Sequence, residues 1–183
     1  MQQPWTADLV GYWFDELQPK QWFERNDDLD NAMRERFLAH YEKTTARYVL
    51  TDALVSPDVA LAHSLLLDQL PRNLFRGSPR AFASDGKALA LAKAAVTRGL
   101  DMQVAPIRRT FLYLPFEHSE VLADQDRSVE LFTALGDADT LKFAQAHYDI
   151  VARFGRFPHR NAILGRPSTP EELAFLATPG SGF

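Results

Sequence analysis

The chain has 183 residues, a length typical of one domain, and 46% of them are apolar, which is enough for a packed core. Its net charge of -4 gives no overall attraction to nucleic acid or anionic lipid, and the absence of cysteine excludes disulfides, thiolate metal sites and cysteine nucleophiles. We therefore expect a single all-helical domain over residues 1–183, without a nucleic-acid or membrane partner.

Targeting signals are not evident in the chain. The first basic residue is Lys20, so the basic start of a signal peptide is missing. The longest strongly apolar stretch, around residues 59–67, is interrupted by His63 and Ser64 and is too short to span a bilayer. The expected location is the cytoplasm.

The first half of the chain predicts three main helices. Apolar side chains at helical spacing favour a helix over residues 5–17 and another over about 26–48. The Ser-Pro-Asp sequence at 56–58 combines a cap, a proline in the first turn and an acid, which is a strong start signal. The helix that it opens should run over about 57–70 and stop at Pro71, because proline has no N–H to donate.

The second half of the chain also contains caps, prolines and glycines that mark where helices start and end. Helices are expected over about residues 84–98, 106–114, 119–135, 137–154 and 169–177. No segment alternates apolar and polar residues for long enough to favour a strand. The fold class is therefore all-α, and we expect about eight or nine helices stacked as antiparallel pairs in a tetratricopeptide-like right-handed superhelix.

Arginine is unusually prominent in this acidic chain. Of the 20 basic residues 15 are Arg, and residues 150–170 hold four of them and no acid. Arg72 and Arg76 are four residues apart, as are Arg156 and Arg160, so in helices each pair points the same way. Like charges on one face repel unless a negative group lies between them.

Two kinds of negative group are consistent with this pattern. The first is a small ligand that bears phosphate or carboxylate. The residues that would then form the pocket are Arg72, Asn73, Arg76, Arg156, Arg160 and Asn161. The second is the protein's own carboxylates, for which Asp68 and Asp149 are placed four residues before Arg72 and Arg153. Glu117, Glu120 and Asp124 are further candidates for such a structural network.

The sequence Phe-Glu-His-Ser-Glu at 116–120 is the second place where chemistry is expected. A histidine next to carboxylates often acts as a general acid or base in catalysis, so His118, Glu120 and His159 are the catalytic candidates. The alternative is that this turn only caps the following helix. The chain contains neither a G-x-S-x-G nor an H-E-x-x-H sequence, so we expect no nucleophile elbow, no metal and no organic cofactor.

A metal site built from separate histidines stays open as a weaker alternative. His118, His147 and His159 would have to meet in space to provide three ligands. His147, however, lies between Phe143 and Ile150 on the apolar stripe of the helix expected over 137–154. A histidine in such a place is more often a hydrogen-bonded core residue.

Long motifs in this chain resemble those of the bacterial family called domain of unknown function 924. They include Trp-Phe at 13–14 and 22–23, Leu-Asp-Gln-Leu-Pro-Arg-Asn-Leu-Phe-Arg-Gly at 67–77, Ala-Phe-Ala-Ser-Asp at 81–85, Leu-Pro-Phe-Glu-His-Ser-Glu at 114–120, Asp-Gln at 124–125 and Arg-Phe-Gly-Arg-Phe-Pro-His-Arg-Asn at 153–161. The resemblance implies an all-α fold similar to tetratricopeptide stacks. It implies no established activity, and no catalytic role is carried over.

The leading hypothesis is that the polar motifs form a pocket for a small anionic ligand, with hydrolytic or acid–base turnover as an extension. The rival hypothesis is a helical-repeat scaffold that binds a protein partner and uses its arginines structurally. RNA binding through residues 150–170 is a third, weaker hypothesis, because only Phe154 and Phe157 accompany the arginines as stacking aromatics.

Overall fold

A computed structural model describes residues 4–182, and this part of the chain contains helices and no strand. The α-helices in chain order are α1 (Pro4–Gly11), α2 (Asp27–Ala46), α3 (Leu50–Ala53), α4 (Pro57–Ser64), α5 (Leu70–Leu74), α6 (Asp85–Thr97), α7 (Pro106–Glu117), α8 (Leu122–Leu135), α9 (Ala138–Phe154) and α10 (Pro170–Leu176). A π-helical segment, Leu65–Gln69, joins α4 and α5 into one continuous helix, which leaves nine separate α-helices among the described residues. The all-α prediction is confirmed.

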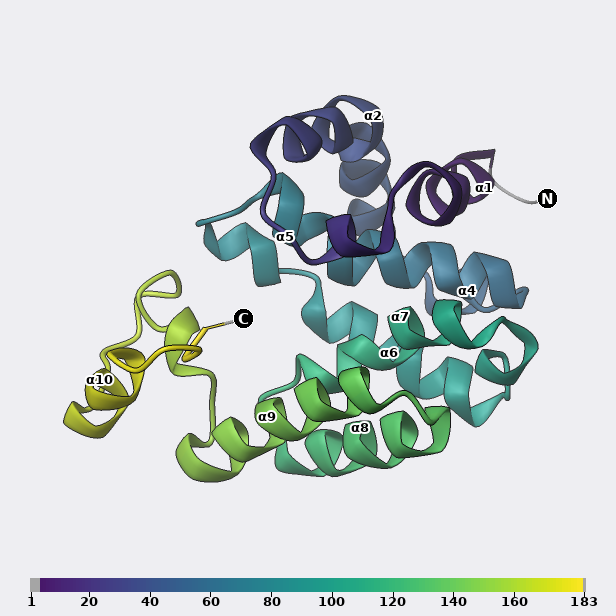
Figure 1. Cartoon of the computed structure of the whole chain (residues 1–183). Helices are drawn as coiled ribbons and strands as arrows, with labels where there is room; N and C mark the ends of the chain where they lie inside the picture. The colour runs from purple at the N-terminus through teal and green to yellow at the C-terminus, as the bar shows by residue number, and fades with distance from the viewer. Residues whose placement is uncertain (1–3, 183) are drawn as a thin grey trace. The chain divides into compact units, whose positions relative to one another are not determined.

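The chain forms two compact units. Among the described residues, the first unit contains 4–76 and 80–115, and the second contains 77–79 and 116–182. In the first unit, fully buried side chains such as Trp13, Phe37 and Phe111 form the core. In the second, α8 and α9 lie side by side (Figure 1). None of the described helices is both long and apolar enough to cross a membrane.

Most predicted helix starts are confirmed by the caps that the sequence provides. The side chain of Asn26 accepts the N–H groups of Asp28 and Leu29 at the start of α2. Ser56 caps α4 by accepting the N–H of Val59, and Thr169 forms a reciprocal capping box at the start of α10. The helix expected from Ser119 begins later, at Leu122: the Ser119 hydroxyl accepts the N–H of Val121 before the helix and donates to Asp124 in its first turn.

Two helices continue through prolines that were expected to end them. Pro71 lies inside α5 and Pro115 lies inside α7. A proline cannot donate to the carbonyl four residues earlier, which here is that of Leu67 or of Phe111. In both cases a buried serine replaces the missing donor: the Ser84 hydroxyl donates to the Leu67 carbonyl and the Ser64 hydroxyl donates to the Phe111 carbonyl, each at 2.6 Å.

Because the Ser64 hydroxyl takes the place of the N–H that Pro115 lacks, Ser64→Ala should leave the Phe111 carbonyl buried without a hydrogen bond. We expect this change to destabilise the protein by about 1–3 kcal/mol. Restoring a backbone N–H with Pro115→Ala should recover part of that loss in the double variant. Urea denaturation of the four proteins in this cycle measures both effects. Thr97→Ala is the control, since its exposed hydroxyl donates only within α6. Equal losses from Ser64→Ala and Thr97→Ala would contradict this explanation.

The inward face of α9 differs from the prediction at one position. Ala144, His147, Ile150 and Val151 are buried, as their helical spacing indicates. Phe143 was expected to face inward, but it is 55% exposed. Ala144, His147 and Val151 follow the three- and four-residue spacing of one helix face, and Phe143 lies just outside that face.

Candidate functional site

The carboxyl end of α7 and the turn after it carry two polar side chains to one place in the second unit. Glu117 is buried and His118 is half-buried. The amide of the fully buried Gln125, on α8, donates to the carbonyl oxygens of Glu117 and Ser119, each at 2.6 Å. Ser119 in turn donates to Asp124 at 2.8 Å. These bonds fix the backbone of the turn and therefore the positions of Glu117 and His118.

His147, from the middle of α9, completes this cluster. Its Nδ1 lies 3.1 Å from Oε1 of Glu117 and 2.9 Å from the carbonyl oxygen of Phe143. The rings of His147 and His118 have centroids 6.1 Å apart. One carboxylate oxygen of Glu117 and one nitrogen from each histidine all lie within 4.8 Å of one another. We call Glu117, His118 and His147 the Glu-His-His cluster.

The environment keeps His147 neutral. Burial lowers its pKa to about 3, and the positive charge on His118 when protonated lowers it further than the bond to the Phe143 carbonyl can raise it. At neutral pH the contact between His147 and Glu117 is therefore a hydrogen bond to a carboxylate rather than an ion pair. A neutral imidazole has a lone pair with which it can accept a proton or bind a cation.

An aromatic ring supports the cluster from the segment that follows α9. The fully buried ring of Phe157 meets the ring of His147 edge-on at 5.5 Å and packs with Ile150 and Val151. The guanidinium of the buried Arg160 lies over the same ring, 4.5 Å from its centroid, and the ring of His159 lies 5.6 Å from it. Phe157 thus brings His159 and Arg160 to the neighbourhood of His147.

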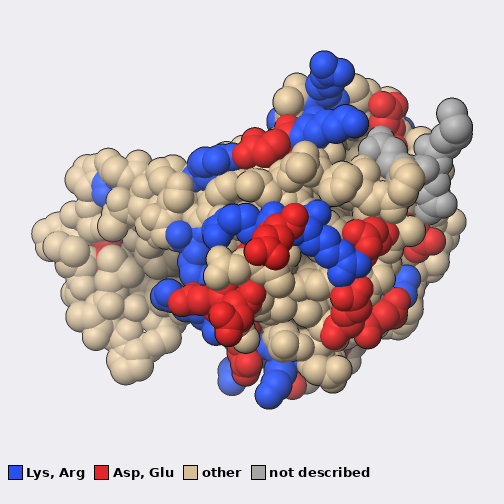
Figure 2. Space-filling model, turned by 90° about the horizontal axis from the view of Figure 1, so that it is seen from above, with Lys and Arg blue, Asp and Glu red and all other residues tan. Residues whose placement is uncertain are grey.

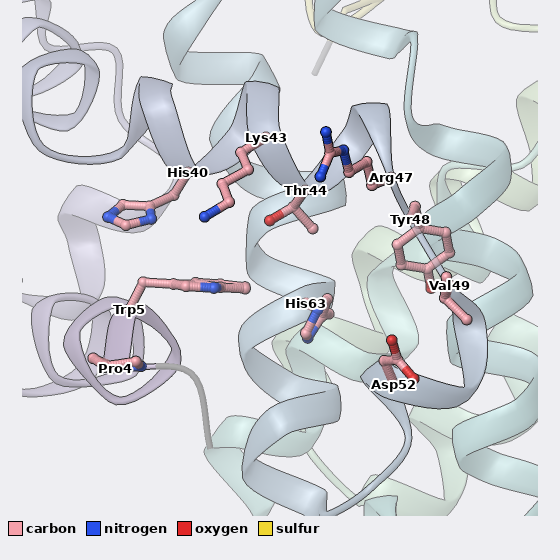
Figure 3. A pocket seen from close by; sticks show the side chains of 10 residues that line it. All are labelled: Pro4, Trp5, His40, Lys43, Thr44, Arg47, Tyr48, Val49, Asp52 and His63. Carbon is pink, nitrogen blue, oxygen red and sulfur yellow. The ribbon is translucent and has the colours of Figure 1, made fainter. Parts of the chain in front are cut away.

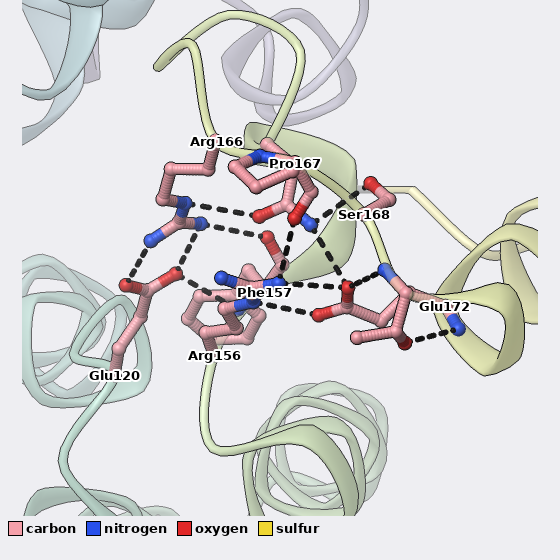
Figure 4. A network of polar contacts seen from close by, with 9 residues as sticks. Glu120, Arg156, Phe157, Arg166, Pro167, Ser168 and Glu172 are labelled. Carbon is pink, nitrogen blue, oxygen red and sulfur yellow. Dashed lines mark hydrogen bonds and ion pairs between the residues drawn. The ribbon is translucent and has the colours of Figure 1, made fainter.

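Arg156 and Asn161 belong to a separate polar network, which Figure 4 shows. Arg156 binds the two carboxylate oxygens of Glu172 at 2.6 and 2.8 Å. Asn161 donates to the same carboxylate at 3.3 Å and to Ser168 at 3.0 Å. The Arg156 guanidinium lowers the pKa of Glu172 to about 2, so this carboxylate stays ionised at neutral pH. The network ties α10 to the segment after α9.

Glu120 is also held by an arginine (Figure 4). Arg166 binds both of its carboxylate oxygens, at 2.7 and 2.9 Å, and the backbone N–H of Phe157 donates to Oε1 at 2.8 Å. Burial by itself would raise the pKa of Glu120, but these hydrogen bonds outweigh burial and the pKa is lower than usual. Glu120 is therefore an ionised partner of Arg166, which makes it a poor proton donor.

The remaining predicted residues lie in the first unit and also hold carboxylates. Arg72 binds Asp85 at 3.0 Å and lies 3.5 Å from Asp68. Arg76 binds Asp30 at 2.7 Å, and Asn73 donates to the same carboxylate at 2.8 Å. The buried Asp30 is thus the ion-pair partner of Arg76, and the buried Asp68 is a partner of Arg72.

Comparison with known proteins agrees with this all-α architecture and assigns no activity. A family model described as a bacterial protein of unknown function (DUF924) matches residues 9–180. The chain belongs to this family. No curated protein matches the chain. A solved structure of a protein of unknown function from Agrobacterium tumefaciens, ATU0120, is 42% identical, has a TM-score of 0.89, and covers 94% of this chain and 97% of its own.

In this DUF924 protein the sequence-based expectations about the polar residues have several outcomes. The predicted pair of Asp68 with Arg72 is present. The predicted pair of Asp149 with Arg153 is wrong, because Arg153 binds Glu171 from α10 instead, at 2.9 Å. That carboxylate comes from a helix 18 residues away, which a rule for neighbours within one helix does not consider.

Sequence reasoning did not predict the contact between His147 and Glu117 in this DUF924 protein. His147 was interpreted as a core residue, with a weaker alternative as a metal ligand beside His118 and His159; it is buried as expected, but it also contacts Glu117. Glu117 was considered as an ion-pair partner and as one of the carboxylates beside His118. The one available signal was that His147 lies on the buried face of its helix and that Glu117 and His118 are adjacent in a family motif. Only the packing of α9 joins them.

Proposed function

We propose that the Glu-His-His cluster binds a divalent transition-metal ion and that this ion activates water for the hydrolysis of a small anionic substrate. The observation that carries the proposal is that the three ligand atoms lie within 4.8 Å of one another. Ligands of a tetrahedral ion at about 2.1 Å are roughly 3.4 Å apart, so small side-chain rotations suffice to close the site.

The type of ligand supports a catalytic role rather than a structural one. Two histidines and one carboxylate bind zinc or a similar ion and leave a coordination position for water. Structural sites usually have four protein ligands. An ion held by Glu117, His118 and His147 would lower the pKa of a bound water and so would supply a nucleophile at neutral pH for an ester or amide carbon or a phosphorus atom.

The residues around Phe157 support an anionic substrate. Arg160 provides a permanent positive charge next to the ring that packs against His147. A buried guanidinium beside the cluster would stabilise negative charge that develops during hydrolysis. His159 remains the acid–base candidate here, since Glu120 is bound to Arg166.

Five of the predicted anion-binding residues already bind carboxylates of the protein. Arg72, Arg76 and Arg156 each bind a carboxylate of the protein, as do Asn73 and Asn161. These contacts favour the structural arginine network that we associated with a tetratricopeptide-like scaffold for a protein partner. The scaffold hypothesis and the hydrolase proposal differ at the Glu-His-His cluster, because a scaffold has no need for a metal ion there.

Titration of chelator-treated protein with Zn²⁺, Co²⁺ and Mn²⁺ by calorimetry tests the metal site. We expect one ion per chain, and we expect His118→Ala or Glu117→Gln to weaken its binding by roughly 100-fold or more, since the loss of a second-shell partner alone costs 10–100-fold. His40→Ala and Glu171→Gln are the matched controls, because neither residue belongs to the cluster. Undiminished binding in the cluster variants would refute the metal site.

The hydrolytic step needs a separate measurement. Release of p-nitrophenol from p-nitrophenyl acetate and p-nitrophenyl phosphate should depend on the added ion and should be lost in His118→Ala. Arg160→Gln should reduce turnover of the phosphate more than that of the uncharged acetate. A protein that binds one ion but accelerates neither reaction would retain the metal site and refute the hydrolase.

A further inference from the structure

The first unit contains a cavity of about 470 Å³ that lies apart in sequence from the Glu-His-His cluster. It is lined by α1, by the carboxyl end of α2, by the segment that leads into α3, and by α4 (Figure 3). Small-molecule sites usually have volumes of about 300–1,000 Å³. The cavity is therefore large enough for a metabolite rather than for a single ion.

One wall of the cavity is aromatic. Trp5 is buried, and its ring meets that of His63 edge-on at 5.0 Å and stacks on that of His40 at 6.1 Å. The ring of Tyr48 lies 6.3 Å from that of His63 and adds a further planar surface. Rigid aromatic rings that line a cavity provide flat apolar surface against which another planar ring can stack.

The carboxyl end of α2 adds positive charge to the cavity lining. Lys43 lies in the last turn of α2 and Arg47 directly follows the helix, and both side chains line the cavity (Figure 3). Neither side chain makes an ion pair or a hydrogen bond within residues 4–182, whereas Arg72, Arg76 and Arg156 all hold carboxylates. The one acidic residue that lines the cavity is Asp52. The lining thus has an excess of positive charge.

His63 adds a hydrogen-bonding atom to the cavity lining. Its Nδ1 lies 2.9 Å from the carbonyl oxygen of Val59, to which it donates when that nitrogen carries the proton. The other ring nitrogen, Nε2, then accepts a hydrogen bond from a ligand. An acceptor beside the ring of Trp5 suits the N–H or O–H groups at the edge of a heterocycle.

We propose that this cavity binds a planar heteroaromatic phosphate monoester, with its ring against Trp5 and its phosphate between Lys43 and Arg47. Two cations that line one cavity repel each other unless an anion lies between them, and a phosphate dianion provides two negative charges. The proposal concerns residues of the first unit only and does not depend on the proposed metal site.

Calorimetric titration of the full chain with adenosine monophosphate and uridine monophosphate tests this proposal. We expect at least one of them to bind with a dissociation constant below about 1 mM, and we expect adenosine or uridine without the phosphate to bind at least about tenfold more weakly. The fluorescence of Trp5 provides a second readout, because Trp13 and Trp22 do not line the cavity. Failure of both nucleotides to bind below about 1 mM would overturn the proposal.

The variant that decides the location of binding is Lys43→Gln/Arg47→Gln. It should bind the nucleotide at least about tenfold more weakly and remain folded, since both side chains are exposed. The double variant Arg98→Gln/Lys142→Gln removes the same charge from exposed positions outside the cavity and should bind as the wild type does. Equal binding by the two double variants would overturn the proposal. A Trp5 fluorescence titration with the same midpoint in Lys43→Gln/Arg47→Gln as in the wild type would also overturn it.

Discussion

Replacement of Arg72 by alanine should lower the free energy of unfolding by about 3–5 kcal/mol, because one partner of a buried ion pair would be removed. Asp68 is completely buried, and its carboxylate lies 3.5 Å from the Arg72 guanidinium. Asp85 receives two further hydrogen bonds from the same group, at 3.0 and 3.2 Å. Without Arg72 both negative charges lose this partner while Asp68 stays in the interior.

Urea denaturation of Arg72→Ala beside Arg25→Ala measures this effect. Arg25 also binds an aspartate, Asp27, but the two side chains are 71% and 72% exposed. Exposed pairs contribute about 0–1 kcal/mol, so the control variant should be nearly as stable as the wild type. An Arg72→Ala protein of normal stability that no longer binds an anionic ligand would instead favour the anion-binding role.

Phe157→Ala should cost about 3–5 kcal/mol and should also weaken metal binding at the Glu-His-His cluster. The ring of Phe157 is fully buried against Ile150 and Val151, so its removal leaves a cavity in the second unit. The same ring packs against His147 and lies under the Arg160 guanidinium. Its loss should therefore remove the surface that holds both side chains in place.

Phe143→Ala is the matched control for that variant. The side chain of Phe143 is more than half exposed on α9, and its truncation should change stability by no more than about 0.5 kcal/mol. Thermal unfolding together with Zn²⁺ titration separates the two effects of Phe157→Ala. If metal affinity is unchanged in a destabilised but folded Phe157→Ala protein, then the ring supports the core and does not position His147.

Local signals in the sequence were sufficient for much of the helical architecture. Asn26, Ser56 and Thr169 are caps that act within three residues, and each of them starts a helix where it was expected. Such interactions form between neighbours in the chain, so their outcome depends little on the rest of the fold. The same reasoning placed Ile150 and Val151 on a buried face of α9.

Local rules failed where a distant group altered the outcome. Pro71 and Pro115 each remove a backbone donor, and this favours the end of a helix in an isolated segment. In the folded protein Ser84 and Ser64 provide the missing hydrogen bonds to Leu67 and Phe111 across 17 and 47 residues of sequence. No pattern within α5 or α7 reveals these donors.

The candidate site likewise depends partly on local sequence and partly on contacts between distant residues. The sequence by itself determined an acidic, cysteine-free, all-helical chain and identified His118, His159 and Arg160 as residues of interest. The pair of Asp68 with Arg72 followed from sequence spacing, but only the tertiary structure decided which carboxylates Arg76, Arg153 and Arg156 bind. Only the tertiary structure placed His147 3.1 Å from Glu117. The physical reason is that ligand sets and buried ion pairs depend on distances between helices, whereas sequence spacing fixes distances only along a single helix.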